Sequence, residues 1–211
     1  MTAAKRVLDV AGATAGLLVL APLFAVIALL VRVEDGGPAF FLQERVGYQG
    51  RVFRMWKFRT MVRDAESRGL PLTVGRDPRV TRVGAWLRRL KVDELPQLLN
   101  VLIGNMTLVG PRPEVPRYVA LYDGAQRRVL GLVPGITDEA SIRYSEEDAL
   151  LATAADPERF YVDELMGEKI RINLEYAARA TVWTDVGVIL ATLRHLFWPR
   201  DPTGRSLAAK S

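Results

Sequence analysis

The chain has 211 residues, enough for one domain with a buried core or for such a domain plus a membrane element. It has no cysteine, which excludes disulfides, thiolate zinc sites and cysteine nucleophiles, and its single histidine, His195, excludes a multi-histidine metal centre. The formal net charge of +5 suits an anionic membrane surface, a phosphorylated substrate or nucleic acid, and composition leaves these three open.

An apolar stretch near the start of the chain predicts a membrane helix. No residue from 10 to 31 carries a charge, whereas Lys5 and Arg6 precede the stretch and Arg32 follows it. A helix of this length, at about 1.5 Å per residue, reaches about 30 Å, the thickness of a bilayer core. A fully buried helix of a soluble domain is the other interpretation of the same pattern.

Pro22 lies near the middle of this stretch and removes one helical hydrogen bond. Because transmembrane helices tolerate proline, a kinked span and a helix that enters and leaves by the same leaflet both fit the pattern. The chain beyond Arg32 contains phosphate-type motifs and no second apolar span. If these motifs use a nucleotide, both ends of the helix face the cytoplasm, so we expect a re-entrant helix broken at Pro22.

The remaining chain predicts a mainly helical α/β domain with a small hairpin. Residues 39–58 read as two short strands around a turn at Gly47–Gly50. Residues 79–91 predict an amphipathic helix with Trp86 on its apolar face. This helix suits either an interfacial position on lipid headgroups or docking on the domain, and the sequence leaves both open.

Further helices are expected later in the chain. One follows Asp93, a second begins at Asp156–Pro157 and runs to about Ala180, and a third covers 184–198. The expected organisation is therefore a membrane helix at 1–35, a cytoplasmic catalytic domain at 36–200 and a disordered tail at 201–211.

Two adjacent acids, Asp93 and Glu94, stand between basic residues and a leucine-rich segment. We expect Asp93 to cap a helix and Glu94 to be its first residue, because free N–H groups at a helix N-terminus favour anions. A carboxylate can attack phosphorus and form an acyl phosphate. Mg²⁺ suits the same place, since it takes one or two carboxylates plus substrate phosphates. A capping Asp beside a solvated Glu is the alternative interpretation.

Basic residues in or beside the neighbouring motifs predict substrate binding. Guanidinium groups hold phosphate oxygens in two-point contacts, and Pro111 and Pro113 fix the backbone on either side of Arg112. Any one arginine is more often a surface charge, but several around one acidic pair indicate a site. The candidate substrate-binding residues are Lys57, Arg59, Arg88, Pro111, Arg112 and Pro113.

The motifs together resemble the bacterial sugar transferase family, the small monotopic phosphoglycosyl transferases. They occur in the family's order and cover most of the chain, which looks like the minimal catalytic unit. The matching segments are Lys5–Arg6, Gln43–Gly47, Trp56–Met61, Asp77–Gly84, Asp93–Leu102, Leu108–Glu114 and Pro134–Thr137.

The resemblance implies transfer of a sugar-1-phosphate from a UDP-sugar to polyprenyl (undecaprenyl) phosphate, giving a polyprenyl-diphosphate-sugar and UMP. It implies that Asp93 attacks the β-phosphate and becomes a phosphosugar-aspartyl intermediate. Glu94 then assists as a base or positions the acceptor, and Mg²⁺ held near Asp93 neutralises the diphosphate. This would be the first membrane step of bacterial glycoconjugate or exopolysaccharide synthesis.

The resemblance also implies a place in the cell and a membrane element. Lys5, Arg6, Ala21 and Pro22 belong to that element, a re-entrant helix in the bacterial inner (cytoplasmic) membrane, with the catalytic domain on the cytoplasmic face. Relatives commonly have Ser where this chain has Ala21. After Thr137 many relatives continue Gly-x-Ala-Gln-Val-Asn-Gly-Arg, whereas residues 138–144 read Asp-Glu-Ala-Ser-Ile-Arg-Tyr, which marks a different donor or subgroup.

Other function classes compete with the transferase. A non-catalytic, membrane-attached basic binding protein explains the charge and the apolar stretch but gives the acidic pair no purpose. A nucleic-acid-binding module would need stacking or helix-turn-helix motifs. The sequence shows neither, so no nucleic acid is expected as a partner. The expected partners are a UDP-sugar, polyprenyl phosphate and membrane lipid, and the sequence leaves a homodimer open.

Overall fold

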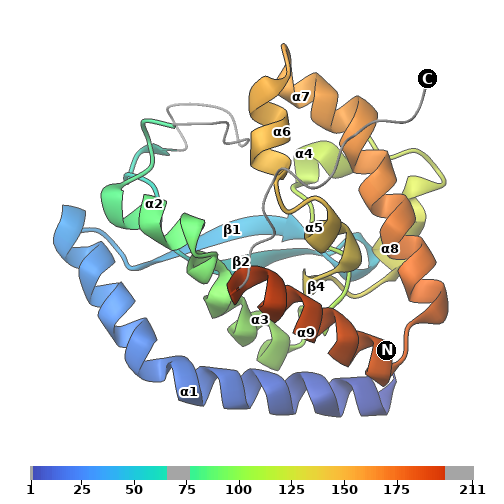
Figure 1. The fold of residues 1–211 in the computed structure, drawn as a ribbon, viewed down its shortest axis with the longest axis horizontal. Helices are drawn as coiled ribbons and strands as arrows, with labels where there is room; N and C mark the ends of the chain where they lie inside the picture. Colours follow the sequence, from blue (N-terminus) through green and yellow to red (C-terminus); the bar gives the residue numbers. More distant parts are fainter. Residues whose placement is uncertain (1, 66–76, 198–211) are drawn as a thin grey trace.

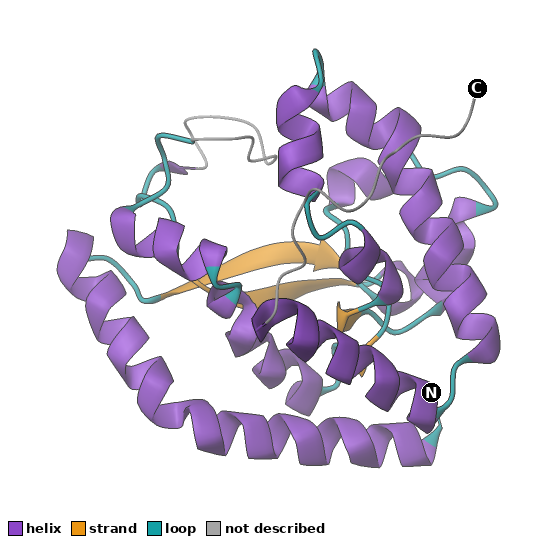
Figure 2. Ribbon diagram, in the orientation of Figure 1, coloured by secondary structure: helices purple, strands orange, loops and turns teal. Residues whose placement is uncertain are grey.

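The computed structural model describes residues 2–65 and 77–197, which form a mainly helical molecule with its strands at the centre (Figures 1 and 2). The mainly helical α/β class expected from the sequence is confirmed. The tail expected to be disordered lies outside the described residues.

The chain begins with a long helix, α1 (Ala3–Asp35), which contains Pro22 and is apolar and long enough to cross a membrane. Figure 1 shows α1 running along one edge of the molecule and bending partway. Proline is the usual cause of a sharp bend, because it lacks the N–H and crowds the preceding turn. The expected break is therefore a bend within one continuous helix.

The N-terminal arm of α1 is fixed to the domain by charged side chains. The buried Asp9 carboxylate accepts a hydrogen bond from the Thr107 hydroxyl at 2.7 Å and another from the Leu108 N–H at 2.9 Å. Arg6 donates to the carbonyls of Val101 and Leu102 at 2.6 and 2.9 Å. These contacts hold the N-terminal arm of α1 against α3 and β3.

The C-terminal arm of α1 packs on the same domain. Ile27 and Val31 belong to an apolar cluster with Phe58 and Leu87. The Glu34 carboxylate accepts hydrogen bonds from backbone N–H groups at the start of the next helix. Both ends of α1 therefore contact one body.

The expected hairpin is confirmed. Strands β1 (Phe40–Val46) and β2 (Val52–Phe58) pair antiparallel, joined by a short 3₁₀ turn, η1 (Tyr48–Gly50). Met55 and Phe58 are buried beneath α1, so β2 fixes the position of Lys57 between them.

The expected amphipathic helix is α2 (Arg82–Arg89), capped by Thr81. Leu87 is fully buried whereas Trp86 is 42% exposed. A 3₁₀ segment, η3 (Val92–Gln97), and helix α3 (Leu98–Ile103) follow. The expected cap at Asp93 was wrong, because η3 begins after Lys91 in a left-handed conformation (φ 56°), which places Asp93 inside the segment.

A second, parallel pair of strands carries the other half of the site. Strand β3 (Thr107–Val109) pairs with β4 (Gly135–Thr137), and between them lie α4 (Pro116–Val119) and the 3₁₀ segment η4 (Gln126–Gly131). Gly110 and Gly135 approach so closely that neither position has room for a Cβ. This contact sets the direction of the chain as it leaves β3.

Helices complete the fold. They are α5 (Glu139–Arg143), α6 (Glu147–Thr153), α7 (Pro157–Phe160), the π-helical turn η5 (Tyr161–Met166), α8 (Gly167–Arg179) and α9 (Val182–Phe197). The start at Asp156–Pro157 is confirmed, because the Asp156 carboxylate caps α7 by accepting from the Arg159 N–H. The expected end at Ala180 is confirmed within a residue, since α8 ends at Arg179.

Candidate active site

Glu94 lies between two cations that come from different parts of the chain. The Lys57 Nζ, on β2, donates to Glu94 Oε1 at 3.0 Å. The Arg112 guanidinium, in the segment after β3, donates to both carboxylate oxygens, with 2.7 Å between Nη1 and Oε2. The structure thus brings together three residues that the sequence proposed for one site.

The charges of this cluster are coupled and largely removed from water. Burial lowers the pKa of Lys57 to about 8, although Glu94 opposes the shift. Burial alone would raise the pKa of Glu94, but Arg112 and Lys57 hold it well below its ordinary value. Glu94 in turn raises the pKa of Arg112. At neutral pH the cluster therefore holds two cations and one anion.

Asp93 stands beside this cluster with its carboxylate free. Only 8% of the residue is exposed, and within the described parts of the chain its side chain has no hydrogen-bond or ion-pair partner. Burial raises its pKa, and the negative charge of Glu94 raises it further. An unpaired carboxylate near Lys57, Arg88 and Arg112 is an available nucleophile in a positive field.

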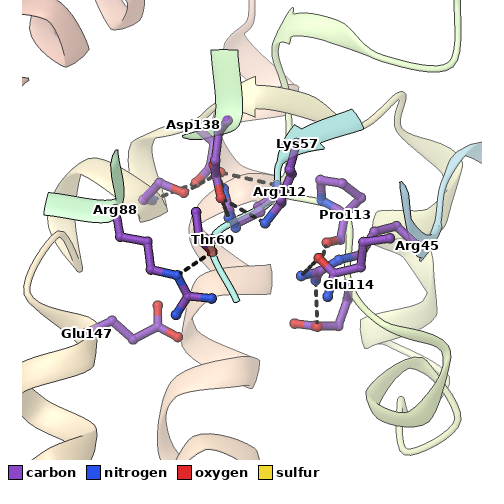
Figure 3. Close-up of polar contacts among 12 residues, drawn as sticks. Arg45, Lys57, Thr60, Arg88, Arg112, Pro113, Glu114, Asp138 and Glu147 are labelled. Atoms are coloured by element: carbon purple, nitrogen blue, oxygen red, sulfur yellow. Dashed lines mark hydrogen bonds and ion pairs between the residues drawn. The ribbon is translucent and has the colours of Figure 1, made fainter. Parts of the chain in front are cut away.

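Arg88 and Arg59 occupy separate positions. Arg88, on α2, donates through Nε to the Thr60 hydroxyl at 2.8 Å (Figure 3), and α2 lies close because Gly84 packs directly on Thr60. Arg59 instead pairs with Asp35 at the end of α1. Arg88 is therefore held at Thr60, just after β2, whereas Arg59 attaches the C-terminal end of α1 to the end of the hairpin.

The two prolines beside Arg112 are held through their carbonyl groups. The Pro111 carbonyl accepts from the Gly135 N–H at 3.0 Å, and the Pro113 carbonyl accepts from Arg45 Nη1 at 3.0 Å (Figure 3). The turn of residues 111–113 is thus attached to β4 on one side and to β1 on the other. These two hydrogen bonds hold the backbone on either side of Arg112.

Lys5 and Arg6, which the sequence assigned to the membrane element, lie in α1 and contact the domain. Lys5 donates to the Val109 carbonyl at 2.9 Å and to the Asp185 carboxylate at 2.5 Å. Arg6 covers the carbonyls at the end of α3, where a cation complements the helix dipole. Ala21 and Pro22 lie on the exposed side of α1, and their place in a membrane stays a prediction.

Two residues of the site were not found from the sequence. Asn100 is fully buried on α3, accepts from the Trp56 N–H at 2.9 Å and donates to the Arg54 carbonyl at 2.8 Å. It thereby joins the segment that carries Asp93 to the strand that carries Lys57. Arg45 is a second case, and its place in the Gln43–Gly47 motif was the available indication.

The metal expected from the sequence has a limited set of ligands. Within residues 2–65 and 77–197 no group of three or more His, Cys, Asp or Glu residues could hold a metal ion. The Glu94 oxygens already accept from Lys57 and Arg112, which leaves the Asp93 carboxylate. A single carboxylate fits Mg²⁺ that takes its other ligands from substrate phosphates and water.

Comparison with known proteins identifies the chain's relatives. A sequence model of the family described as "Bacterial sugar transferase" matches residues 1–199. The chain belongs to the bacterial sugar transferase family. The resemblance seen in its motifs is therefore confirmed.

Individual relatives within this family are named as sugar-phosphate transferases. The chain is 37% identical over 204 residues to an undecaprenyl-phosphate glucose phosphotransferase of Komagataeibacter xylinus, covering 93% of this chain and 36% of that protein. It is 36% identical over 195 residues to a UDP-N-acetylgalactosamine-undecaprenyl-phosphate N-acetylgalactosaminephosphotransferase of Aeromonas hydrophila. This match covers 90% of this chain and 43% of that protein. It is 36% identical over 203 residues to a UDP-glucose:undecaprenyl-phosphate glucose-1-phosphate transferase of Caulobacter vibrioides, covering 91% and 69%. The chain thus spans less than half the length of the first two of these proteins.

Proposed function

We propose that this bacterial sugar transferase moves a sugar-1-phosphate from a UDP-sugar to polyprenyl phosphate, releasing UMP. The observation that carries the proposal is the free Asp93 carboxylate beside the Lys57–Glu94–Arg112 cluster. The names of the relatives support the donor and acceptor classes.

The chemistry follows as two displacements at one phosphorus atom. An Asp93 oxygen attacks the β-phosphorus of the UDP-sugar, the bond from that phosphorus to the bridging oxygen breaks, and UMP leaves with the electron pair. A phosphate oxygen of the polyprenyl phosphate then attacks the same phosphorus, and the Asp93 carboxylate leaves. In both steps negative charge builds on the phosphate oxygens. Lys57 and Arg112 face this charge, and their positive charges stabilise the transition states.

Glu94 holds the cations in this mechanism. Its oxygens accept from Lys57 and Arg112, and its pKa lies well below the ordinary value, so it is a weak base. A carboxylate in this state suits the positioning of the cations better than removal of a proton. The role of Glu94 as a base, expected from the resemblance, is therefore the less favoured part of the proposal.

The proposed reaction also uses a bound divalent cation. Mg²⁺ supplies charge neutralisation of the diphosphate and would be held by Asp93 and substrate oxygens. Arg88 lies near Asp93 and contributes positive charge there, as Arg112 does. These residues bind and orient the donor whether or not they touch the metal.

The attachment of α1 supports the proposal that this chemistry takes place at a membrane surface. Both arms of α1 contact the same domain, so the whole helix lies on one side of the molecule (Figure 1). A helix fixed in this way enters and leaves by one leaflet. A helix that crossed the bilayer would have its two ends on opposite sides, and one domain could not contact both. Its outward side is apolar, with Leu18, Val19, Leu29 and Val33 each more than 60% exposed. We place the domain on the cytoplasmic face of the inner membrane, where UDP-sugars are found.

The test is UMP release by the detergent-solubilised protein with a panel of donors. UDP-glucose and UDP-N-acetylgalactosamine, the donors in the names of relatives, are assayed with undecaprenyl phosphate, with and without Mg²⁺. We expect UMP release that needs both the acceptor and Mg²⁺. If no UDP-sugar releases UMP while the protein binds anionic vesicles, the chain is a membrane-attached binding protein instead.

A further inference from the structure

Asp138 lies against the turn that carries Arg112. It is the first residue of the segment that departs from the usual family sequence. Asp138 follows β4 directly, and only 1% of it is exposed. Its Oδ2 accepts a hydrogen bond from the Arg112 backbone N–H at 3.2 Å. Figure 3 shows Asp138 on one side of Arg112, with Arg45 and Pro113 on the other.

The Arg112 N–H is a special donor. Because Pro111 and Pro113 lack an N–H, Arg112 supplies the only backbone donor of the three-residue turn. The two proline carbonyls are already bound to Gly135 and Arg45. Asp138 therefore provides a third attachment of the turn's backbone, at the N–H of Arg112.

Helix capping accounts for only part of the Asp138 contacts. Its Oδ1 accepts from the Ser141 N–H at 2.7 Å, which caps α5, and its Oδ2 accepts from the Ser141 hydroxyl at 2.8 Å. A cap needs neither full burial nor a bond to a distant turn. The negative charge also lies near the Arg112 guanidinium.

We propose that Asp138 is a positioning residue that fixes the Arg112 backbone so that its guanidinium meets the donor diphosphate. The proposal rests on the proposed function, since it assumes that Arg112 binds the donor. Asp138 does not touch the reacting atoms, and its effect on the reaction passes through Arg112.

Asp138→Asn separates this role from capping. The asparagine oxygen can still accept from the Ser141 N–H, and asparagine is as good an N-cap as aspartate. Its NH₂ group then occupies the Oδ2 position, where it can donate to the Ser141 hydroxyl but faces the Arg112 N–H as a second donor. Ser141→Ala is the matched control, because it removes the hydroxyl contact and leaves the Arg112 contact.

The first measurement needs no substrate. Hydrogen–deuterium exchange of the Arg112 amide in the full-length protein should accelerate at least tenfold in Asp138→Asn and stay near the wild-type rate in Ser141→Ala. An unchanged rate in Asp138→Asn would overturn the proposal, whatever the activity of the protein. If Asp138→Asn does not fold, Asp138→Ser keeps a capping hydroxyl too short to reach Arg112 and gives the same readout.

The second measurement is a double-mutant cycle on UMP release. Asp138→Asn should lower kcat/KM for the UDP-sugar roughly tenfold, mainly through KM, because a hydrogen bond to a charged group is lost. In an Arg112→Ala background the same change should have less than about a twofold effect. Equal losses in both backgrounds would show that Asp138 acts independently of Arg112. Faster amide exchange in a protein whose wild type releases no UMP would instead reject the proposed function.

Discussion

The Arg112 guanidinium meets the Glu94 carboxylate as a fork, with 2.7 Å between Nη1 and Oε2 and a second bond from Nη2 to Oε1. Lys57 contacts the same carboxylate at 3.0 Å. One partly buried anion thus aligns two cations that lie 55 residues apart in the sequence. These contacts form only if β2, which carries Lys57, and the segment after β3, which carries Arg112, both keep their positions beside Glu94.

The geometry of the fork predicts that arginine cannot be replaced by lysine at position 112. Arg112→Lys keeps the charge but loses the planar two-point contact, so donor use should fall roughly 10- to 100-fold with a similar fold stability. Steady-state kinetics with varied UDP-sugar measure the change, and circular dichroism checks the fold. Kinetics equal to wild type would remove the guanidinium from the donor site.

The two acids should differ in their effect on stability. Glu94→Gln leaves two partly buried cations, Lys57 and Arg112, without their anion, which should lower the free energy of unfolding by about 3 kcal/mol. Asp93→Asn removes a buried carboxylate that has no partner in the described residues, so stability should be unchanged or higher. Chemical denaturation of the two variants compares them. Equal destabilisation would contradict the assigned contacts.

The pH dependence of activity should report Lys57. Because burial lowers its pKa to about 8, Lys57 loses its charge as the pH rises through 8, and donor binding should weaken there. The unfolded chain keeps this proton up to about 10.5, so the Lys57 contribution to stability becomes more favourable between pH 8 and 10.5 while activity falls. In Lys57→Arg the descending limb of kcat/KM should disappear. A limb at the same pH in both proteins would assign it to another group.

The membrane topology of α1 can be tested because the chain has no native cysteine. Single cysteines at Ala3 and Pro38 should both react with a membrane-impermeant maleimide in inside-out vesicles, and neither should react in intact spheroplasts. Ala21→Cys, on the exposed side of the bend, should react in neither preparation because it lies in lipid. Labelling of Ala3→Cys in spheroplasts would show that the helix spans the bilayer.

Elements defined by local patterns were predicted well from the sequence. Two short strand-like segments around the Gly47–Gly50 turn predicted the hairpin, and Asp156–Pro157 marked a helix start, because turns and caps depend on neighbouring residues. The segment at Asp93 was predicted less well. Its left-handed start at Lys91 depends on packing against β2 and α2, which a local pattern does not contain.

The site was predicted in its composition but not in its contacts. Lys57, Glu94 and Arg112 were grouped by charge, and the structure brings them together. The pairing of Arg59 with Asp35 was missed, since it depends on where α1 ends in space. Asp138 was noticed only as a departure from the family sequence, because its contact with Arg112 requires the pairing of β3 with β4.

The most direct test of the account is the mass of the intact protein after incubation with a UDP-sugar and Mg²⁺ in the absence of acceptor. The wild-type protein should gain the mass of one sugar phosphate, release UMP, and lose the added mass when undecaprenyl phosphate is supplied. Asp93→Asn should show neither the added mass nor turnover, while remaining folded. Turnover at the wild-type rate in Asp93→Asn would contradict the role of Asp93 as the nucleophile.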